Sequence, residues 1–262
     1  MLWSLVASRR SFVVMAEWDG SQVILTNHYQ FLAESPAPVA LPNELEVLRE
    51  GSEDFFVVTL NGNNRVMKVN IETGAIAWET PVGVAPYGIV AANGKLYVTN
   101  WGGGIPEDSD PDVAGVPWGS AKVDPETGTI REGTVSILDE VTGEVLEEVV
   151  VGLHPNDIVK SRDERFVYAS NANSDEVSVI STETDQVTET ISVRLMGDEN
   201  PFWGSSPNGL AIARNGKRLY VANGIMPWQW WTWEAGQPPK ERLPRAGWRD
   251  LFPPGPIRVL FA

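Results

Sequence analysis

A short module that ends in asparagine recurs along this chain and restricts the folds that the chain can adopt. In each copy an alternating apolar stretch leads to the asparagine, which is the pattern of a β-strand with two different faces. The copies lie at residues 24–27 (ILTN), 58–61 (VTLN), 97–100 (YVTN), 168–171 (YASN) and 220–223 (YVAN). A second module follows three of these copies and begins at Val66 (VMKVNIETG), Val135 (VSILDEVTG) and Val177 (VSVISTETD).

The last two copies of the second module start about 40 residues apart, and repeats of that length with several strands each are typical of β-propeller blades. No long amphipathic helical pattern accompanies them. We therefore predict an all-β protein, a β-propeller of four-stranded blades. The repeats account for about four to five blades.

The chain divides into three parts by its agreement with the repeat. Within the first part, residues 1–12 fit no repeat, and Asp19-Gly20 between two alternating stretches predicts a hairpin. Residues 30–50 contain several prolines and predict a loop or an edge segment. The three predicted parts are a partial first blade with an irregular segment (residues 1–54), propeller blades (residues 55–224) and a Trp/Pro-rich tail (residues 225–262).

Two insertions interrupt the repeat. Residues 105–132 are rich in Pro, Gly and Asp, and they stand where other blades have a short hairpin loop. Residues 194–206 form a shorter insertion. Long loops on a rigid scaffold are favoured positions for function, so we expect the first insertion to project from one rim of the propeller.

The tail departs from the repeat in a way that points to a displaced reading frame. Trp and Met each have a single codon, so the frame displaced by one base can partly be reconstructed. In that frame Met226 with Pro227 reads as Ala, and Trp231 with Thr232 reads as Asp. The reconstructed peptide is the apolar strand that should follow YVAN. We predict that residues 225–262 are translated out of frame; the alternative is an aromatic platform for sugars or single-stranded nucleic acid.

Sequencing the encoding DNA tests this prediction. We expect the displaced frame to remain open after codon 224 and to encode a further strand and turn of the repeat. Stop codons in that frame, or a displaced peptide without the repeat, would show that the tail is genuine protein sequence.

Composition excludes several classes of partner. The formal net charge of −15 and a pI near 4.5 argue against nucleic acid or an anionic membrane surface, because both require a positive surface. No apolar run approaches the length of a membrane span, so no membrane insertion is expected. The absence of cysteine excludes disulfides, thiolate nucleophiles and Cys-ligated metals. The start of the chain lacks the order of a secretory leader.

Several stretches resemble the YVTN family of β-propeller repeats: PVGVAPYGIV, LYVTNWGGG, YASNANSDEVSVI and GSSPNGLAIA with LYVANG. They are most similar to the propeller part of bacterial proteins fused to an alkaline-phosphatase-like phosphoesterase domain. The resemblance covers about residues 55–224. It implies a bacterial protein, of periplasmic or secreted location, and a propeller of more blades than this chain holds. We therefore expect an incomplete propeller, a fragment of a larger protein, whose open blade edges allow self-association.

Candidate binding residues lie on loops and at blade junctions. His154 stands in GLHPND, where one blade ends and the next begins, and the tryptophans lie on or near the insertions. Aromatic residues on protruding loops suit a binding rim, although a His beside a Pro or a Trp between blades can also be purely structural. The residues predicted to bind a ligand are Trp101, Trp118, His154, Asn156, Asp157 and Trp203.

Other patterns predict structure rather than chemistry. The acidic run at residues 107–112 resembles an oxygen-ligand loop for Ca²⁺ but lacks the EF-hand Gly and terminal Glu, so a solvated loop is expected. The repeated asparagines Asn100, Asn171 and Asn223 are expected to cap strand ends by bonds to backbone groups. The common hydrolase motifs GxSxG and HExxH are absent. No catalytic residue, metal or cofactor is predicted.

The sequence thus predicts a non-catalytic propeller module that serves as a binding surface or scaffold for a protein or small-molecule ligand. Two alternatives remain open. One is a propeller-type hydrolase, related to lactonases or phosphoesterases, with a site at the channel mouth where acidic, Asn or His side chains converge. The other is a structural repeat that associates with itself.

Overall fold

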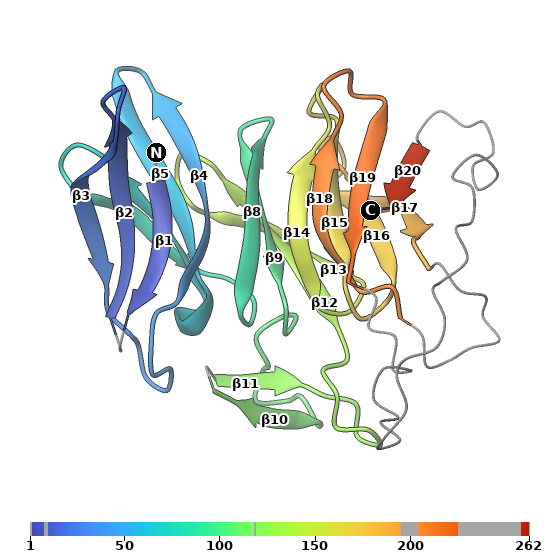
Figure 1. The fold of residues 1–262 in the computed structure, drawn as a ribbon. Helices are drawn as coiled ribbons and strands as arrows, with labels where there is room; N and C mark the ends of the chain where they lie inside the picture. The colour runs from blue at the N-terminus through green and yellow to red at the C-terminus, as the bar shows by residue number, and fades with distance from the viewer. Residues whose placement is uncertain (1, 8–9, 118, 195–203, 225–257, 262) are drawn as a thin grey trace, which may run out of the picture.

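The computed structural model describes residues 2–7, 10–117, 119–194, 204–224 and 258–261, and these residues form β-sheets that follow one another along the chain (Figure 1). Three of the sheets have four strands in sequence order, each a propeller blade as predicted. They are β4 (Pro42–Glu50), β5 (Glu53–Leu60), β6 (Arg65–Asn70) and β7 (Ile76–Pro81); β8 (Pro86–Ala92), β9 (Lys95–Asn100), β12 (Gly133–Asp139) and β13 (Val145–Val151); and β14 (Pro155–Lys160), β15 (Phe166–Asn171), β16 (Glu176–Ser181) and β17 (Gln186–Ser192).

A three-stranded sheet flanks these blades on each side. The first contains β1 (Leu2–Ala7), β2 (Arg10–Trp18) and β3 (Val23–Phe31), and the last contains β18 (Pro207–Ile212), β19 (Arg218–Asn223) and β20 (Arg258–Phe261). The part of the chain that the structure describes therefore holds five blade-like sheets, three of them with four strands. This confirms the predicted all-β propeller fold, and the number of sheets agrees with the predicted four to five blades.

Two segments of residues 1–54 form strands that the sequence did not predict. The segment 1–12, which fits no repeat, contributes β1 and the start of β2, and the hairpin predicted at Asp19-Gly20 joins β2 to β3. The expected loop or edge at residues 30–50 contains β4, which forms one edge of its sheet. Pro42 opens this strand, a position where the missing N–H of proline does not break a ladder. The predicted start of the repeat region at Phe55 lies inside β5.

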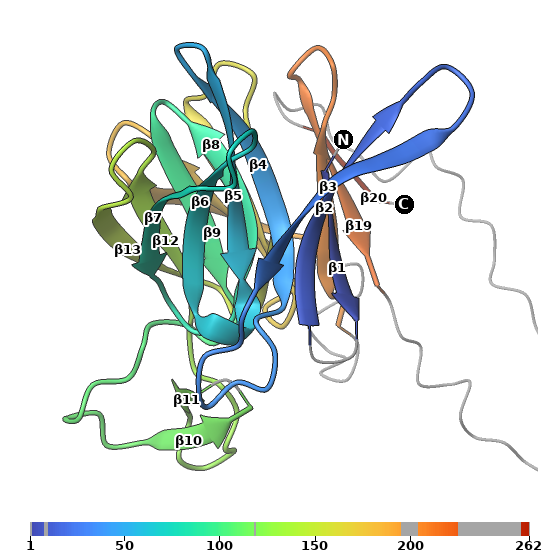
Figure 2. The ribbon, with the colours of Figure 1, turned by 90° about the vertical axis from the view of Figure 1, so that its left-hand side faces the viewer.

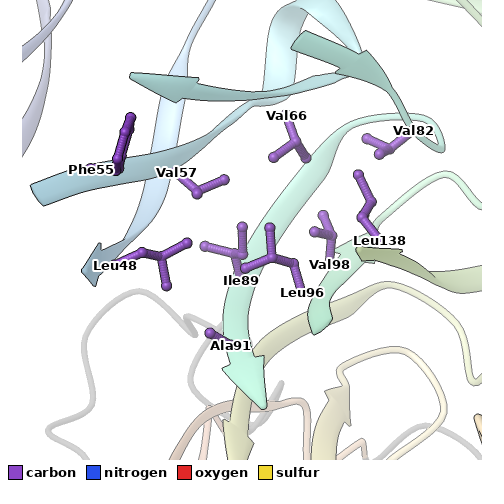
Figure 3. Packing of buried hydrophobic residues seen from close by; sticks show 10 residues of the cluster. All are labelled: Leu48, Phe55, Val57, Val66, Val82, Ile89, Ala91, Leu96, Val98 and Leu138. Carbon is purple, nitrogen blue, oxygen red and sulfur yellow. The ribbon is translucent and has the colours of Figure 1, made fainter. Parts of the chain in front are cut away.

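Neighbouring blades pack face to face through apolar side chains. Figure 3 shows one such cluster, in which Leu48, Val57 and Val66 of the first complete blade meet Ile89 and Leu96 of the second. Three further clusters of the same kind pack the other neighbouring sheets against each other. Burial of these alternating residues is the main stabilising term of the fold.

The first strand of each blade contacts the first strand of the next, which links β1 to β4, β4 to β8, β8 to β14 and β14 to β18. From β4 onward each of these strands begins with a proline and has an irregular register after it. The residue before each proline has a left-handed backbone conformation: Leu41 (φ 53°), Ala85 (56°), His154 (56°) and Ser206 (47°). Such bulges bend a strand and redirect its side chains, and they are common beside functional sites.

A threonine of the asparagine-ending module ties adjacent blades together at this bulge. The hydroxyl of Thr99 accepts a bond from the Gly88 N–H (2.8 Å) and donates to the Asn156 carbonyl of the next blade (2.6 Å). Thr59 makes the equivalent bridge, since it accepts from the Glu44 N–H (3.1 Å) and donates to the Tyr87 carbonyl (2.9 Å). The hydroxyl thus satisfies two backbone groups that the bulge removes from the ladder.

The repeated asparagines hold the ends of the second strands in a different way from the predicted one. Asn100 Nδ2 donates to the hydroxyls of Thr134 (3.0 Å) and Ser136 (2.9 Å) on β12, and the equivalent asparagine of β15 donates to a serine hydroxyl on β16. The expected bond to the backbone is therefore wrong at these two positions, because the antiparallel neighbour presents hydroxyl side chains there. Asn223 does donate to the backbone carbonyl of Val193 (3.2 Å).

The long insertion projects from one rim, as expected. It contains a small hairpin of β10 (Val113–Val116) and β11 (Gly119–Lys122), which lies below the blades in both views (Figures 1 and 2). Of the predicted out-of-frame tail, only β20 lies within the described residues, and it pairs in parallel with β19. Among the described residues, no helix is long and apolar enough to span a bilayer.

Replacing Thr99 by the isosteric valine tests the bridge between blades. Thr99→Val removes the hydroxyl from a fully buried position, which leaves the Gly88 N–H and the Asn156 carbonyl without this partner. We expect the free energy of unfolding, measured with urea, to fall by about 1–3 kcal/mol. The control is Thr190→Val on the exposed face of β17, which should change it by less than about 0.5 kcal/mol. Equal effects of the two substitutions would contradict the bridging role.

Candidate functional site

The beginnings of the first strands surround an open pocket between the blades. The pocket has a volume of about 360 Å³ and receives side chains from β4, β8, β14 and β18. Each of these strands opens with the sequence Pro-x-x-Leu/Ile: PNEL, PYGI, PNDI and PNGL. The two variable residues of this pattern supply the lining, which consists of Asn43, Glu44, Tyr87, Asp157 and Asn208.

The residue after each proline joins one blade to the next. Asn43 Nδ2 donates to the Tyr87 carbonyl (3.1 Å), and Asn156 Nδ2 donates to Asn208 Oδ1 (2.6 Å). Asn156 is almost completely buried, and its Oδ1 has no hydrogen-bond partner among the described residues. An unpaired buried acceptor costs stability, so a position of this kind is suited to receiving a donor.

Two carboxylates occupy the next position of the pattern in alternate blades. Glu44 Oε2 accepts a bond from the Ile89 N–H of the next blade (3.3 Å). Asp157 repeats this arrangement, because its Oδ2 accepts from the Leu210 N–H of the next blade (2.5 Å) and its Oδ1 accepts from the Ile158 N–H (2.8 Å). The carboxylates therefore replace ladder bonds that the bulges lack.

Burial places these two carboxyl groups in an unusual electrostatic state. Desolvation raises the pKa of Glu44 from 4.5 to about 7, and the nearby charge of Asp157 adds to the effect. Desolvation also raises the pKa of Asp157, while its backbone N–H donors oppose the shift. Raised carboxyl pKa values are frequent at functional sites, although structural networks produce them as well. The pocket thus holds a carboxyl group that changes its protonation near neutral pH.

In the blade between the two carboxylates, Gly88 takes the equivalent position because no side chain fits there. A Cβ atom on Gly88 would lie 2.7 Å from the Asn156 carbonyl oxygen and 3.1 Å from Glu44 Oε2. Real Cβ atoms do not approach backbone oxygens this closely. The glycine therefore allows the first strands of two blades to come together at the pocket.

Three aromatic rings stack beside the pocket. Tyr87 and Trp101 are stacked with ring centroids 4.5 Å apart and 22° between their planes, and Trp101 meets His154 at 4.6 Å and 59°. All three side chains are half-buried, and Trp101 Nε1 has no hydrogen-bond partner among the described residues. Burial lowers the pKa of His154, which favours the neutral imidazole. Of the three rings only Tyr87 lines the pocket, so it is the aromatic face that a ligand there would meet.

Of the six residues predicted to bind a ligand, four lie in the described part of the chain, and one of them, Asp157, lines the pocket. Trp101 contacts His154, and Asn156 and Asp157 follow His154 on β14. Trp118 and Trp203 lie outside the described residues. The prediction missed the lining residues of the other blades, although the recurring Pro-x-x-Leu/Ile pattern marks all of them in the sequence. The residues that the sequence argument did not include are Asn43, Glu44, Tyr87 and Asn208.

The acidic run of the insertion is bound to its own hairpin. Asp110 accepts a bond from the Glu107 N–H (2.8 Å) and faces Lys122 (3.6 Å) and Arg131 (3.9 Å). In the described part of the chain, no group of three or more His, Cys, Asp or Glu side chains is placed to hold a metal ion.

Three solved structures are similar to this chain. A candidate 6-phosphogluconolactonase from Bacteroides uniformis has a TM-score of 0.50 and 13% identity, over 82% of this chain and 58% of that chain. Hydrazine synthase of Kuenenia stuttgartiensis has a TM-score of 0.45 and 19% identity, over 62% and 37%. The dihydro-heme d1 dehydrogenase NirN has a TM-score of 0.45 and 12% identity, over 84% and 41%.

The chain therefore spans less than two thirds of each of these proteins. At 13% identity the similarity to the candidate 6-phosphogluconolactonase, whose TM-score is 0.50, shows a propeller-type fold alone. No protein-family model matches the sequence. None of the curated proteins matches it significantly.

The raised pKa of Glu44 predicts a dependence of stability on pH. Between pH 4.5 and about 7 the folded protein holds a proton on Glu44 that the unfolded chain has lost, so unfolding releases this proton. The Glu44 contribution to the free energy of unfolding therefore decreases as pH rises through this range, by about 1–3 kcal/mol. Glu44→Gln, which cannot ionise, should remove this part of the pH dependence in urea unfolding.

The matched control is Glu126→Gln, on an exposed turn of the insertion. It should leave the slope of stability against pH between 4.5 and about 7 as in the original protein. If Glu44→Gln also leaves the slope unchanged, Glu44 does not titrate near neutral pH.

Proposed function

We propose that this chain is a non-catalytic β-propeller module of the YVTN type that binds a ligand at the pocket between the first strands of its blades. One observation carries the proposal: side chains from four successive blades converge on a single pocket beside the Tyr87–Trp101–His154 stack.

The backbone around the pocket is fixed before any ligand arrives. The threonine bridges and the carboxylate bonds to the Ile89 and Leu210 N–H groups hold the first strands in place. A preformed site loses little conformational entropy on binding, which favours affinity.

The lining indicates the chemistry of the ligand. Tyr87 supplies an aromatic face, and Asn43, Asn208 and Glu44 supply amide and carboxyl groups around it. This combination suits a small polar molecule with one flat apolar face, or the tip of a protein loop with the same character. In a longer parent protein the module would present such a ligand or partner to an attached phosphoesterase domain, for which this chain has no residues.

A propeller-type hydrolase of the lactonase or phosphoesterase class is the second candidate. The pair of Glu44 and Asp157 favours it, because a carboxyl group with a pKa near 7 is suited to proton transfer. Against it, both oxygens of Asp157 already accept backbone N–H bonds, which leaves that carboxylate engaged in structure.

Alanine substitution at the aromatic face tests the binding proposal. The protein is screened by thermal shift against sugars, sugar phosphates, amino acids and nucleotides, and each hit is quantified by calorimetry. Tyr87→Ala removes the ring that faces both the pocket and Trp101, so we expect affinity for a genuine ligand to fall by about tenfold or more. The control is Tyr220→Ala on β19, which should retain the original affinity. Ligands whose affinity is unaffected by Tyr87→Ala would contradict the proposed site.

Activity assays separate the two candidates. The protein is assayed with lactones and phosphomonoesters, with and without added Ca²⁺, Mg²⁺, Mn²⁺ and Zn²⁺. A binding module should give no turnover above background under any of these conditions. Turnover that Glu44→Gln abolishes and Glu126→Gln retains would overturn the non-catalytic proposal in favour of the hydrolase.

A further inference from the structure

The strand β3 ends its sheet where the complete blades have one more strand. In the described part of the chain β3 pairs only with β2, in the order β1-β2-β3, whereas β7, β13 and β17 form the outer strands of the complete blades. Figure 2 shows the β2–β3 hairpin extending away from the other sheets. An edge strand presents a row of backbone groups to which another strand can pair.

The composition of β3 differs from that of the other outer strands. Glutamate occurs in β7 (Glu79), in β13 (Glu147 and Glu148) and in β17 (Glu189), and charges of this kind protect an edge from pairing. β3, with the sequence VILTNHYQF, contains no Asp, Glu, Lys or Arg. In a chain of net charge −15 this uncharged edge is a local exception.

The same strand exposes large apolar side chains. Val23, Ile24 and Leu25 are 53%, 43% and 66% exposed, and Trp18 at the end of β2 is 65% exposed. High β-propensity, low charge and exposure together make a segment prone to strand pairing. The exposed end of the hairpin is therefore suited to cover by a further strand.

An open groove lies on the inner side of this edge. It has a volume of about 560 Å³ and runs between β3 and the outer part of the next blade, where Met67, Val69 and Ile76 line it. Ile76 is 56% exposed. In the complete blades, outer strands of neighbouring sheets contact each other, as β13 and β17 do. A fourth strand beside β3 would fill the equivalent position and cover this groove.

We propose that β3 of a second copy of this chain is that fourth strand, so that two copies pair β3 to β3 in antiparallel orientation about a two-fold axis. The occupant is a second copy because β3 carries no Asp, Glu, Lys or Arg, so two copies of this strand can pair without like charges directly opposite each other; the carboxylates of Glu34 and Glu79 lie in the groove beside it. A two-fold arrangement is self-complementary, and each copy then supplies the strand that the other lacks.

Glutamate substitutions on β3, made in the full chain, test the proposal, because the other outer strands carry glutamates. Analytical ultracentrifugation over about a hundredfold range of concentration should show a monomer–dimer equilibrium. Leu25→Glu sets two carboxylates near each other across the axis, so the dimer dissociation constant should rise by about tenfold or more. Ile24→Glu serves as a second variant, and circular dichroism confirms that both remain folded.

The control substitution is Val150→Glu, at a residue 62% exposed on the outer strand β13, which should leave the dissociation constant unchanged. Hydrogen exchange supplies an independent reading, since with the axis at Leu25 the amides of residues 23–27 should gain protection with concentration and those of β13 should not. A monomer at all concentrations would overturn the proposal. A dimer that Leu25→Glu leaves intact would also overturn it, because association would then use another surface.

Discussion

The bridge that a single threonine hydroxyl makes between successive blades is the interaction on which the rest of this structure depends. From β4 onward each first strand is bent by a bulge after its proline, and a bulge removes backbone groups from the ladder. Thr59 and Thr99 accept one of those groups within their own blade and donate to a carbonyl of the next. Because an unpaired buried backbone group is costly, the hydroxyl fixes the spacing and the register of neighbouring blades together.

The pocket is a consequence of the same bulge. The bend turns the two residues after each proline toward the space between blades, so Glu44 and Asp157 become buried and accept backbone N–H groups of the following blade. Burying carboxyl groups opposes stability, and these backbone bonds offset part of that cost. The site and the junction between blades are therefore built from the same residues, and a substitution at either affects both.

The strands at the outer edges of the complete blades differ from β3 in the charged residues that they carry. The outer strands of the complete blades are exposed and carry glutamates, whereas the first strands contact the first strands of neighbouring blades. β3 follows neither pattern, since it lies at the end of a sheet with no charge and with exposed Val23 and Leu25. Its composition matches that of a strand with a partner on each side.

The sequence alone determined the fold class and the strands, because a period of two within strands and about 40 between modules is visible without any contact information. It also placed Trp101, His154, Asn156 and Asp157 at blade junctions. It did not reveal β4, which begins at Pro42 after two further prolines, or the role of Glu44, which depends on a partner 45 residues away. Only the tertiary structure decided those points, since the distance between blades, the burial of a carboxyl group and its pKa are properties of packing between distant segments.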